Sequence, residues 1–255
     1  MASLLEPGWL AAAGLAAGDI TGRSVAGIVL PLVFTVALIL ALVWLAKRQY
    51  RGAKAKIQEQ TAAMEAWAAA QGWAYEDERP DLLRRWRRAS WPTGAKEAIK
   101  DYVSGHHRDR VVAACEYQFD DEFSEGIKAT RFTVCALTLP MALPRLVLKP
   151  ENALKGVRRV LGRGDIEVGW PQFDDAWRLT ADDAAFAQAV VARPLQQVLV
   201  ERSFPRQHLE IVGQDLLIWA RGRPDPAVLE PLFDALIAVA DAIPGWVWTA
   251  YGRSV

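Results

Sequence analysis

The longest apolar stretch of the chain lies near its N-terminus. Residues Ala26–Ala46 read AGIVLPLVFTVALILALVWLA, 21 positions without a charged side chain, and 13 of them are Leu, Ile, Val or Phe. A helix of this length spans about 31 Å at a rise of about 1.5 Å per residue, and the hydrocarbon core of a bilayer is about 30 Å thick. The pattern therefore predicts a transmembrane helix, with Trp44 where an indole ring favours the membrane interface.

Two other interpretations of this stretch stay open. A buried helix of a soluble core is seldom free of charge over such a length. A cleaved signal peptide would have a positive N-terminal region and a shorter apolar region of about 7–15 residues. Residues 1–25 instead hold Glu6, Asp19 and one cation, Arg23, and Lys47 and Arg48 directly follow the apolar stretch. These features favour an uncleaved anchor.

The charges on either side of the stretch predict its orientation. Five cations and no acid follow it: Lys47, Arg48, Arg51, Lys54 and Lys56. The tail before it has a net charge of −1, from one cation and two acids. Positive flanks stay in the cytoplasm, so we expect a single-pass protein of the cell membrane with its N-terminus outside and its C-terminal domain cytoplasmic. The five cations are candidates for contact with anionic lipid headgroups.

The expected organisation has four parts along the chain. They are a short extracytoplasmic tail (1–25), the transmembrane helix (26–46), a basic juxtamembrane helix (47–72) and a cytoplasmic domain (73–255). The composition of residues 47–71 favours helix and contains no proline, so the membrane helix can continue into the cytoplasm. Gly72 suits a helix C-cap.

Alternating apolar and polar positions predict strands in the domain. In Val111–Phe119 the alternation places Cys115 and Tyr117 on one face and Glu116 and Gln118 on the other. A hairpin turn is expected at 105–109 and another at 213–215, and two prolines predict a bend at 140–144. The remaining expected strands are 73–75, 99–104, 131–139, 146–148, 166–168, 176–179, 208–212 and 216–220.

Several helices are expected between these strands. Thr180 and Asp183 form a capping box before a helix at 182–192, and Asp225 caps a helix that starts at Pro226 and ends near Ile243. Shorter helices are expected at 82–88, 151–161 and 195–200, and residues 246–248 can dock on the sheet. Because most strands are joined by hairpin-sized connections, the predicted fold class is α+β, with a mainly antiparallel sheet and packed helices after a single N-terminal transmembrane helix.

Overall charge gives no sign of a nucleic-acid partner. The chain has 30 basic and 30 acidic residues, and residues 57–255 have a net charge of −4 once the −1 tail and the +5 cluster are taken away (0 + 1 − 5). Proteins that bind nucleic acid usually carry a basic face. Cys115 and Cys135 are expected to be buried, reduced thiols, because the domain is expected in the cytoplasm.

No motif in the chain predicts a catalytic, cofactor or metal site. The three histidines, His106, His107 and His208, match no metal-ligand spacing. The segment GRGD at 162–165 lacks the Gly-Lys-Ser/Thr ending of a phosphate loop. The arginines of Arg84–Arg88 either contact anionic headgroups or lie solvated on a surface helix that packs Leu83 and Trp86 inward.

Several stretches together resemble a known group of proteins. They are AAAQGWAY (68–75), LLRRW (82–86), VVAACEYQF (111–119), FTVCALTLPMALPRLVLKPE (132–151), the region 165–186 and IPGWVW (243–248). In this order they resemble a family of uncharacterised membrane-anchored proteins found mainly in actinobacteria, across most of residues 64–248. The family has no established activity. The resemblance implies an anchored protein with one continuous domain and assigns no functional residue.

The first functional hypothesis is a non-enzymatic binding or scaffolding module at the inner membrane face. Its partners would be the lipid bilayer, anionic headgroups or an unknown protein. One alternative is a membrane-tethered enzyme of unrecognised type, with a pocket near the His106–Asp109 turn or the Asp120–Glu125 loop. Another is an accessory subunit of a membrane complex.

Overall fold

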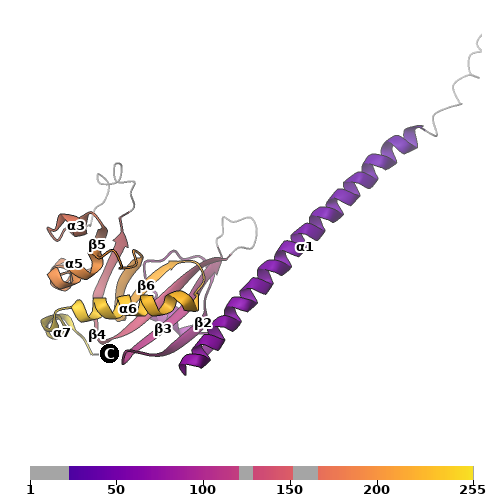
Figure 1. Cartoon of the computed structure of the whole chain (residues 1–255). Coiled ribbons are helices and arrows are strands. Elements are labelled where there is room, and N and C mark those ends of the chain that lie inside the picture. Colours follow the sequence, from indigo (N-terminus) through magenta and orange to yellow (C-terminus); the bar gives the residue numbers. More distant parts are fainter. Residues whose placement is uncertain (1–22, 121–128, 152–165, 255) are drawn as a thin grey trace, which may run out of the picture. The chain divides into compact units, whose positions relative to one another are not determined.

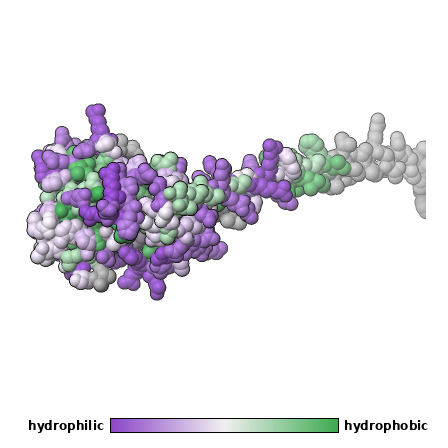
Figure 2. All heavy atoms as spheres, turned by 60° about the horizontal axis from the view of Figure 1, so that its bottom comes forward, coloured by the Kyte–Doolittle hydropathy of each residue, from purple (hydrophilic) through white to green (hydrophobic). Residues whose placement is uncertain are grey.

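The apolar stretch and the polar residues that follow it form one long helix. The computed structural model describes residues 23–120, 129–151 and 166–254, and helix α1 spans Arg23–Gln71. All described side chains from Val33 to Ala46 are exposed, and Figure 2 shows a hydrophobic section of α1 followed by a hydrophilic one. Within the described residues, α1 is the one helix long and apolar enough to cross a membrane. An exposed apolar helix of this length suits a lipid environment.

The chain divides into two units, residues 1–58 and residues 59–255. The last turns of α1 belong to the second unit. There the helix ends in a Schellman motif, in which Trp73 N donates to Ala68 O at 2.8 Å and Gly72 N donates to Ala69 O at 3.1 Å. Gly72 has a φ of 70°, a left-handed conformation that glycine adopts without steric cost.

The second unit is built on an antiparallel sheet, which has six strands in the part of the chain that the structure describes (Figure 1). They are β1 (Ala74–Glu78), β2 (Ala95–His107), β3 (Arg110–Asp120), β4 (Thr130–Pro150), β5 (Trp177–Ala181) and β6 (His208–Arg221). The order is β1-β2-β3-β4-β5, and β6 also pairs with β4.

Strand β4 is the centre of this sheet. Its first half pairs with β3, in a register that includes Val134 opposite Cys115, and its second half pairs with β5. Strand β6 pairs with both halves, from Phe132 to Leu148. The ladder shifts register between Thr138 and Leu146, where the strand contains two prolines.

The helices of the second unit lie after or between these strands. They are α2 (Asp81–Arg85), α3 (Pro171–Asp174), α4 (Ala184–Val190), α5 (Arg193–Val200), α6 (Pro226–Ala242) and α7 (Gly245–Tyr251). Figure 1 shows α6 lying across the sheet, where it contacts β3, β4 and β6. Asp225 caps α6 by accepting a hydrogen bond from the backbone N–H of Ala227 at 3.0 Å.

Each face of the sheet is covered by its own apolar core. On one face, the last turns of α1 and helices α4 to α7 enclose a large cluster that includes Met64, Phe186 and Phe233. On the other face, the segment around α2 packs Trp86 and Trp91 against Tyr117 and Trp219. Successive residues of a strand point to opposite faces of the sheet, and both faces are buried here. The central strands are therefore nearly continuous runs of apolar residues.

The structure confirms the predicted α+β class with a mainly antiparallel sheet. The 105–109 turn is confirmed as the β2–β3 hairpin, with positive φ at Arg108 and Asp109. The Asp225 cap and both buried, free cysteines are also confirmed.

Several local predictions are wrong. Residues 213–215 lie within the continuous strand β6, because its pairing with β4 continues past them. Residues 140–144 lie within β4, and the irregularity predicted there takes the form of a register shift in its ladder with β6. Residues 166–168 form no strand. Residues 246–248 belong to helix α7, which contacts β4 and buries Val247 in the core, so their docking on the sheet is confirmed. Asp183 alone caps α4, since Thr180 is part of β5. The predicted helix at 151–161 and most of the predicted tail at 1–25 lie outside the described residues.

Candidate functional site

The last turns of α1 are part of the core of the second unit. Met64 is 1% exposed and Ala68 is fully buried, and both belong to the cluster on the helical face of the sheet. The Trp67 ring packs edge-on against Trp73 at 5.1 Å between centroids, and Trp73 lies 5.6 Å from Phe233 of α6. Gly105 lies directly under the Trp73 ring, since a Cβ there would approach Trp73 Cγ to 2.3 Å. The helix that leaves the apolar stretch thus ends as a packed element of the domain.

A buried cluster of charged side chains joins this end of α1 to the sheet. Asp101 of β2 accepts a hydrogen bond from Thr61 of α1 at 3.2 Å. Arg223, which follows β6, donates to Asp101 at 2.7 Å and to the Thr61 hydroxyl at 3.3 Å. Tyr75 of β1 donates to the second oxygen of Asp101 at 3.0 Å. One carboxylate therefore connects a helix, two strands and the segment after a third.

Glu116 of β3 extends this cluster. Its side chain is 1% exposed and accepts a hydrogen bond from Arg131 Nε at 3.0 Å. Arg223 Nε lies 2.8 Å from the other oxygen of Glu116, an ion-pair distance at which the N–H is not aligned for a hydrogen bond. Burial raises the pKa of Glu116, and the charges of Arg223 and Arg131 oppose that rise. We refer to Thr61, Asp101, Glu116, Arg131 and Arg223 as the junction cluster.

The geometry of the junction cluster suits holding elements together. Its two carboxylates and two guanidiniums balance in charge, and the side chain of Arg223 is 13% exposed. Burial also raises the pKa of Tyr75, and its hydrogen bond to Asp101 adds to the rise, so the phenol stays protonated as a donor. Loss of one partner from a buried ion pair of this kind destabilises the fold, because the other partner is left as an uncompensated charge.

Sequence reasoning missed most of this cluster. Alternation along β3 predicted that Glu116 lies on the face opposite Cys115. A charged residue within a buried strand was the one local sign that a buried ion pair could form there. Asp101 lies at a register shift of β2 with a φ of 49°, and its partner Arg223 is 122 residues away in sequence. No local pattern pairs them.

A second set of buried acids holds the α2 segment on the opposite face. Asp215 of β6 accepts from Arg85 at 2.7 Å and from the Trp86 indole at 2.7 Å. Glu210 is fully buried, and its carboxylate accepts from Trp219 Nε1 at 2.9 Å and from the backbone N–H of Ser90 at 3.0 Å. Burial raises the pKa of Glu210 against these hydrogen bonds. Both acids therefore act as acceptors that fix the covering segment.

These contacts bear on the Arg84–Arg88 cluster. Trp86 and Leu82 are buried, whereas Leu83 is only partly so. Arg85 pairs with Asp215 and Arg88 pairs with Asp182. Contact of this cluster with a membrane stays a prediction.

The turn at His106–Asp109 is docked on α6. His107 Nε2 lies 2.6 Å from Asp234, and Arg108 pairs with the same carboxylate at 2.8 Å. His106 is exposed. Of the predicted Asp120–Glu125 loop, Asp120 pairs with Lys96 at 3.5 Å, and the remainder lies outside the described residues. Among the residues that the structure describes, no three His, Cys, Asp or Glu side chains are grouped to hold a metal ion.

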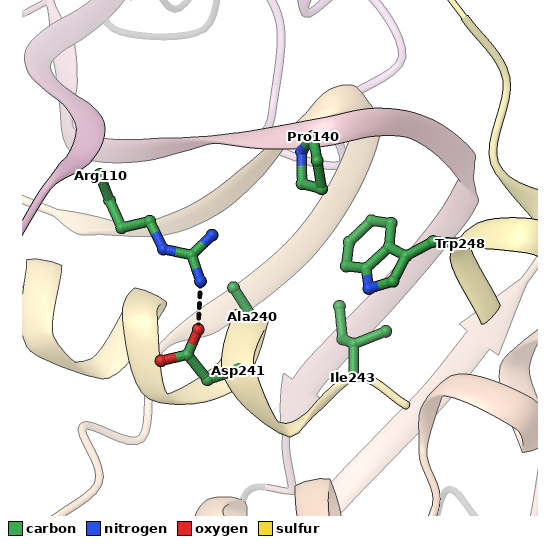
Figure 3. A pocket seen from close by; sticks show the side chains of 6 residues that line it. All are labelled: Arg110, Pro140, Ala240, Asp241, Ile243 and Trp248. Atoms are coloured by element: carbon green, nitrogen blue, oxygen red, sulfur yellow. Dashed lines mark hydrogen bonds and ion pairs between the residues drawn. The ribbon is translucent and has the colours of Figure 1, made fainter. Parts of the chain in front are cut away.

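A pocket of about 300 Å³ is lined by Arg110, the residue that directly follows this turn (Figure 3). Arg110 of β3 and Asp241 of α6 form an ion pair at 2.5 Å on one side of it. The other lining residues are Pro140, Ala240, Ile243 and Trp248. The pocket thus combines one polar wall with apolar surroundings.

The five basic residues after the apolar stretch are all exposed on α1. At about 100° per residue, Lys47, Arg51 and Lys54 follow one side of the helix at spacings of four and three. The Arg48 guanidinium lies 5.4 Å from the centroid of the Trp44 ring, within range of a cation–π contact. Contact of the five basic residues with lipid headgroups stays a prediction.

Comparisons with known proteins find one solved structure with this architecture. No protein-family model matches the chain, and no curated protein matches it. The crystal structure of the mycobacterial trehalose monomycolate transport factor A, TtfA, aligns with a TM-score of 0.50 and 18% identity, over 72% of this chain and 93% of that one. The two proteins share a fold. At this identity the likeness extends to the fold alone. The neighbour's mycobacterial source agrees with the actinobacterial group that the sequence resembles.

Proposed function

We propose that this protein is a single-pass membrane-anchored accessory factor of a transport assembly, whose folded domain is a non-enzymatic binding module at the cytoplasmic face. The observation that carries the proposal is the double role of α1. Its first part is an exposed, apolar helix, whereas its last turns contribute Met64 and Ala68 to the core and Thr61 to the junction cluster. A domain built around the end of its own anchor is suited to work at a membrane.

The accessory role in transport rests on two arguments. The fold is shared with a protein named as a transport factor, over nearly all of that chain. A single helix cannot enclose a pathway, and the stretch from Val33 to Ala46 contains no ionisable residue of the kind that marks one. A transport pathway would therefore be formed by a partner. Trehalose monomycolate, the cargo in the neighbour's name, is the first cargo to test.

Orientation and lipid contact belong to the same proposal. The cluster of Lys47, Arg48, Arg51, Lys54 and Lys56 stays on the cytoplasmic side, and each cation near an anionic leaflet contributes about 1 kcal/mol to the attraction. The stripe of Lys47, Arg51 and Lys54 faces headgroups together, while Arg48 stacks on Trp44 at the interface.

Cysteine labelling in intact cells tests the orientation. Ser3→Cys in the tail and Ala63→Cys on the exposed side of α1 are labelled with a membrane-impermeant maleimide. We expect Ser3→Cys to react at once and Ala63→Cys only after permeabilisation. The native cysteines are buried and serve as the background. The reverse pattern would invert the topology.

Photo-crosslinking in native membranes tests the accessory role. A photoreactive amino acid at Phe34, whose side chain is 71% exposed in the apolar stretch, is compared with one at the exposed Ala63. We expect a discrete adduct with a polytopic membrane protein and reduced cargo export when the gene is depleted. Adducts with lipid alone, together with unchanged export, would refute the transport role while leaving the anchoring intact.

A further inference from the structure

We propose that the pocket between β3, β4, α6 and α7 binds a neutral sugar ring. The pocket measures about 300 Å³, equal to the liquid volume of about ten water molecules at about 30 Å³ each. A hexose, with twelve heavy atoms, is of comparable size. The inference is independent of the proposed transport role.

The polar wall of the pocket carries both donors and acceptors. Arg110 and Asp241 form one ion pair at 2.5 Å, and their side chains are 39% and 53% exposed. A guanidinium has five N–H donors and a carboxylate has about four acceptor positions, and their mutual bond uses one of each. Because the pair is neutral in sum, it does not select for a charged ligand. It does offer fixed, paired hydrogen-bonding groups to neighbouring hydroxyls.

The opposite side of the pocket offers an apolar surface. Figure 3 shows the Trp248 indole facing the pocket between Pro140 and Ile243, across from the Arg110–Asp241 pair. The face of an indole ring is electron-rich and attracts the partly positive edges of flat partners. A pyranose has an apolar face of C–H groups and a rim of hydroxyls. It matches a site with an aromatic surface on one side and donors and acceptors on the other.

Other ligand classes fit these walls less well. An anion would meet the Asp241 carboxylate beside the arginine, and a cation would meet the Arg110 guanidinium. A purely apolar ligand would cover part of the ion pair without replacing the hydrogen bonds that its free donors and acceptors make to water. A small, uncharged polyhydroxy ring satisfies both walls.

Saturation-transfer difference NMR on the full-length protein in nanodiscs tests this site. The probes are D-glucose and D-galactose, with cyclohexanol as an apolar ring of similar size and empty nanodiscs as the blank. We expect transfer to the ring C–H protons of at least one hexose and weaker transfer to cyclohexanol. No transfer to either hexose above the blank, or stronger transfer to cyclohexanol, would overturn the proposal.

Helix α7 contains a matched control. Trp246 is 57% exposed, does not line the pocket and lies two residues from Trp248. We expect Trp248→Ala to weaken hexose binding about threefold to tenfold, the range expected for loss of an aromatic stacking partner, and Trp246→Ala to leave it unchanged. Equal effects of the two variants would overturn the assignment.

Two further variants separate binding from folding. Trp248 packs on the core, so Trp248→Ala is accompanied by Trp248→Phe, which keeps an aromatic face and should retain most of the binding. Asp241→Asn changes only an exposed side chain and should weaken binding at least threefold with an unchanged unfolding temperature. Unchanged hexose binding by Asp241→Asn would show that the Arg110–Asp241 pair does not contact the ligand, and would overturn the proposed site.

Discussion

Replacing Arg223 tests whether the junction cluster holds the end of α1 on the sheet. In Arg223→Met, the carboxylates of Asp101 and Glu116 lose the guanidinium that pairs with both. Asp101 keeps the hydroxyls of Thr61 and Tyr75, and Glu116 keeps Arg131. Removing one partner of a buried ion pair typically costs about 3–5 kcal/mol, because a charge stays buried without compensation.

The magnitude can be read as an unfolding temperature. For a domain of roughly 200 residues, each kcal/mol shifts the midpoint by about 2–4 °C, so Arg223→Met should unfold about 6–20 °C lower. The measurement is near-UV circular dichroism of the full-length protein in detergent, followed on heating and in guanidinium chloride. Hydrogen exchange should report the same loss in residues 59–71, since Thr61 contacts both Arg223 and Asp101.

Two control variants give the result its meaning. Lys100 pairs with Glu78 at 3.0 Å on the surface, with the side chains 41% and 60% exposed, so Lys100→Met should cost less than about 1 kcal/mol. The triple variant Asp101→Asn, Glu116→Gln, Arg223→Met removes every charge of the junction cluster except that of Arg131, whose side chain is 30% exposed, and should recover most of the loss. If Arg223→Met is as stable as Lys100→Met, or the triple variant is no better than the single one, the junction cluster does not stabilise the fold in this way.

The effect should also depend on pH. Burial raises the pKa of Glu116 above its ordinary value, so its folded form binds a proton more readily than its unfolded form. The contribution of this pKa difference to the free energy of unfolding is present at low pH. It is lost as pH rises through the pKa of Glu116 in the folded protein. Without Arg223 that pKa rises further, and the deficit of Arg223→Met relative to the wild type should be smaller at pH 5 than at pH 8.

Three further predictions concern packing, thiols and capping. Gly105→Ala should destabilise the protein by more than about 2 kcal/mol in chemical unfolding, because its methyl group would overlap the Trp73 ring. Burial raises the pKa of both Cys115 and Cys135, so neither should react with a thiol reagent at pH 8 until denaturant is added; modification of the native protein would contradict their burial. Asp225→Ala should cost about 1 kcal/mol by removing the α6 cap, and an unchanged midpoint would show that the cap is dispensable.

Local sequence patterns predicted the elements of this fold better than their connections. The charge-free stretch, the alternation around Cys115 and the glycine after Gln71 each carry their signal within a few residues. Gly213 and Asp215 carry a turn signal as well, and there it fails. Pairing with β4 continues through both, and Asp215 is held by Arg85 and Trp86 from another part of the chain. Long-range partners thus outweigh turn chemistry.

The junction cluster shows the same limit for a site. Glu116 could be assigned to a face from its neighbours, but Asp101 and Arg223 meet only because β2 and the end of β6 approach the same part of α1. The pocket likewise needs Arg110, Asp241 and Trp248 from three separate elements. Such sites depend on tertiary contacts that no single stretch encodes.

The pairing of β4 with β6 has a consequence for synthesis of the protein on the ribosome. Val134 pairs with Trp219 and Leu148 with Leu209, which are 85 and 61 residues apart in sequence. The apolar stretch is made first, while the strand that completes the central ladder is made more than 150 residues later (208 − 46 = 162). Until then, Met64 and Ala68 lack part of the core that buries them. Non-local pairing of this kind slows folding, so the nascent chain should depend on chaperones until β6 has been made.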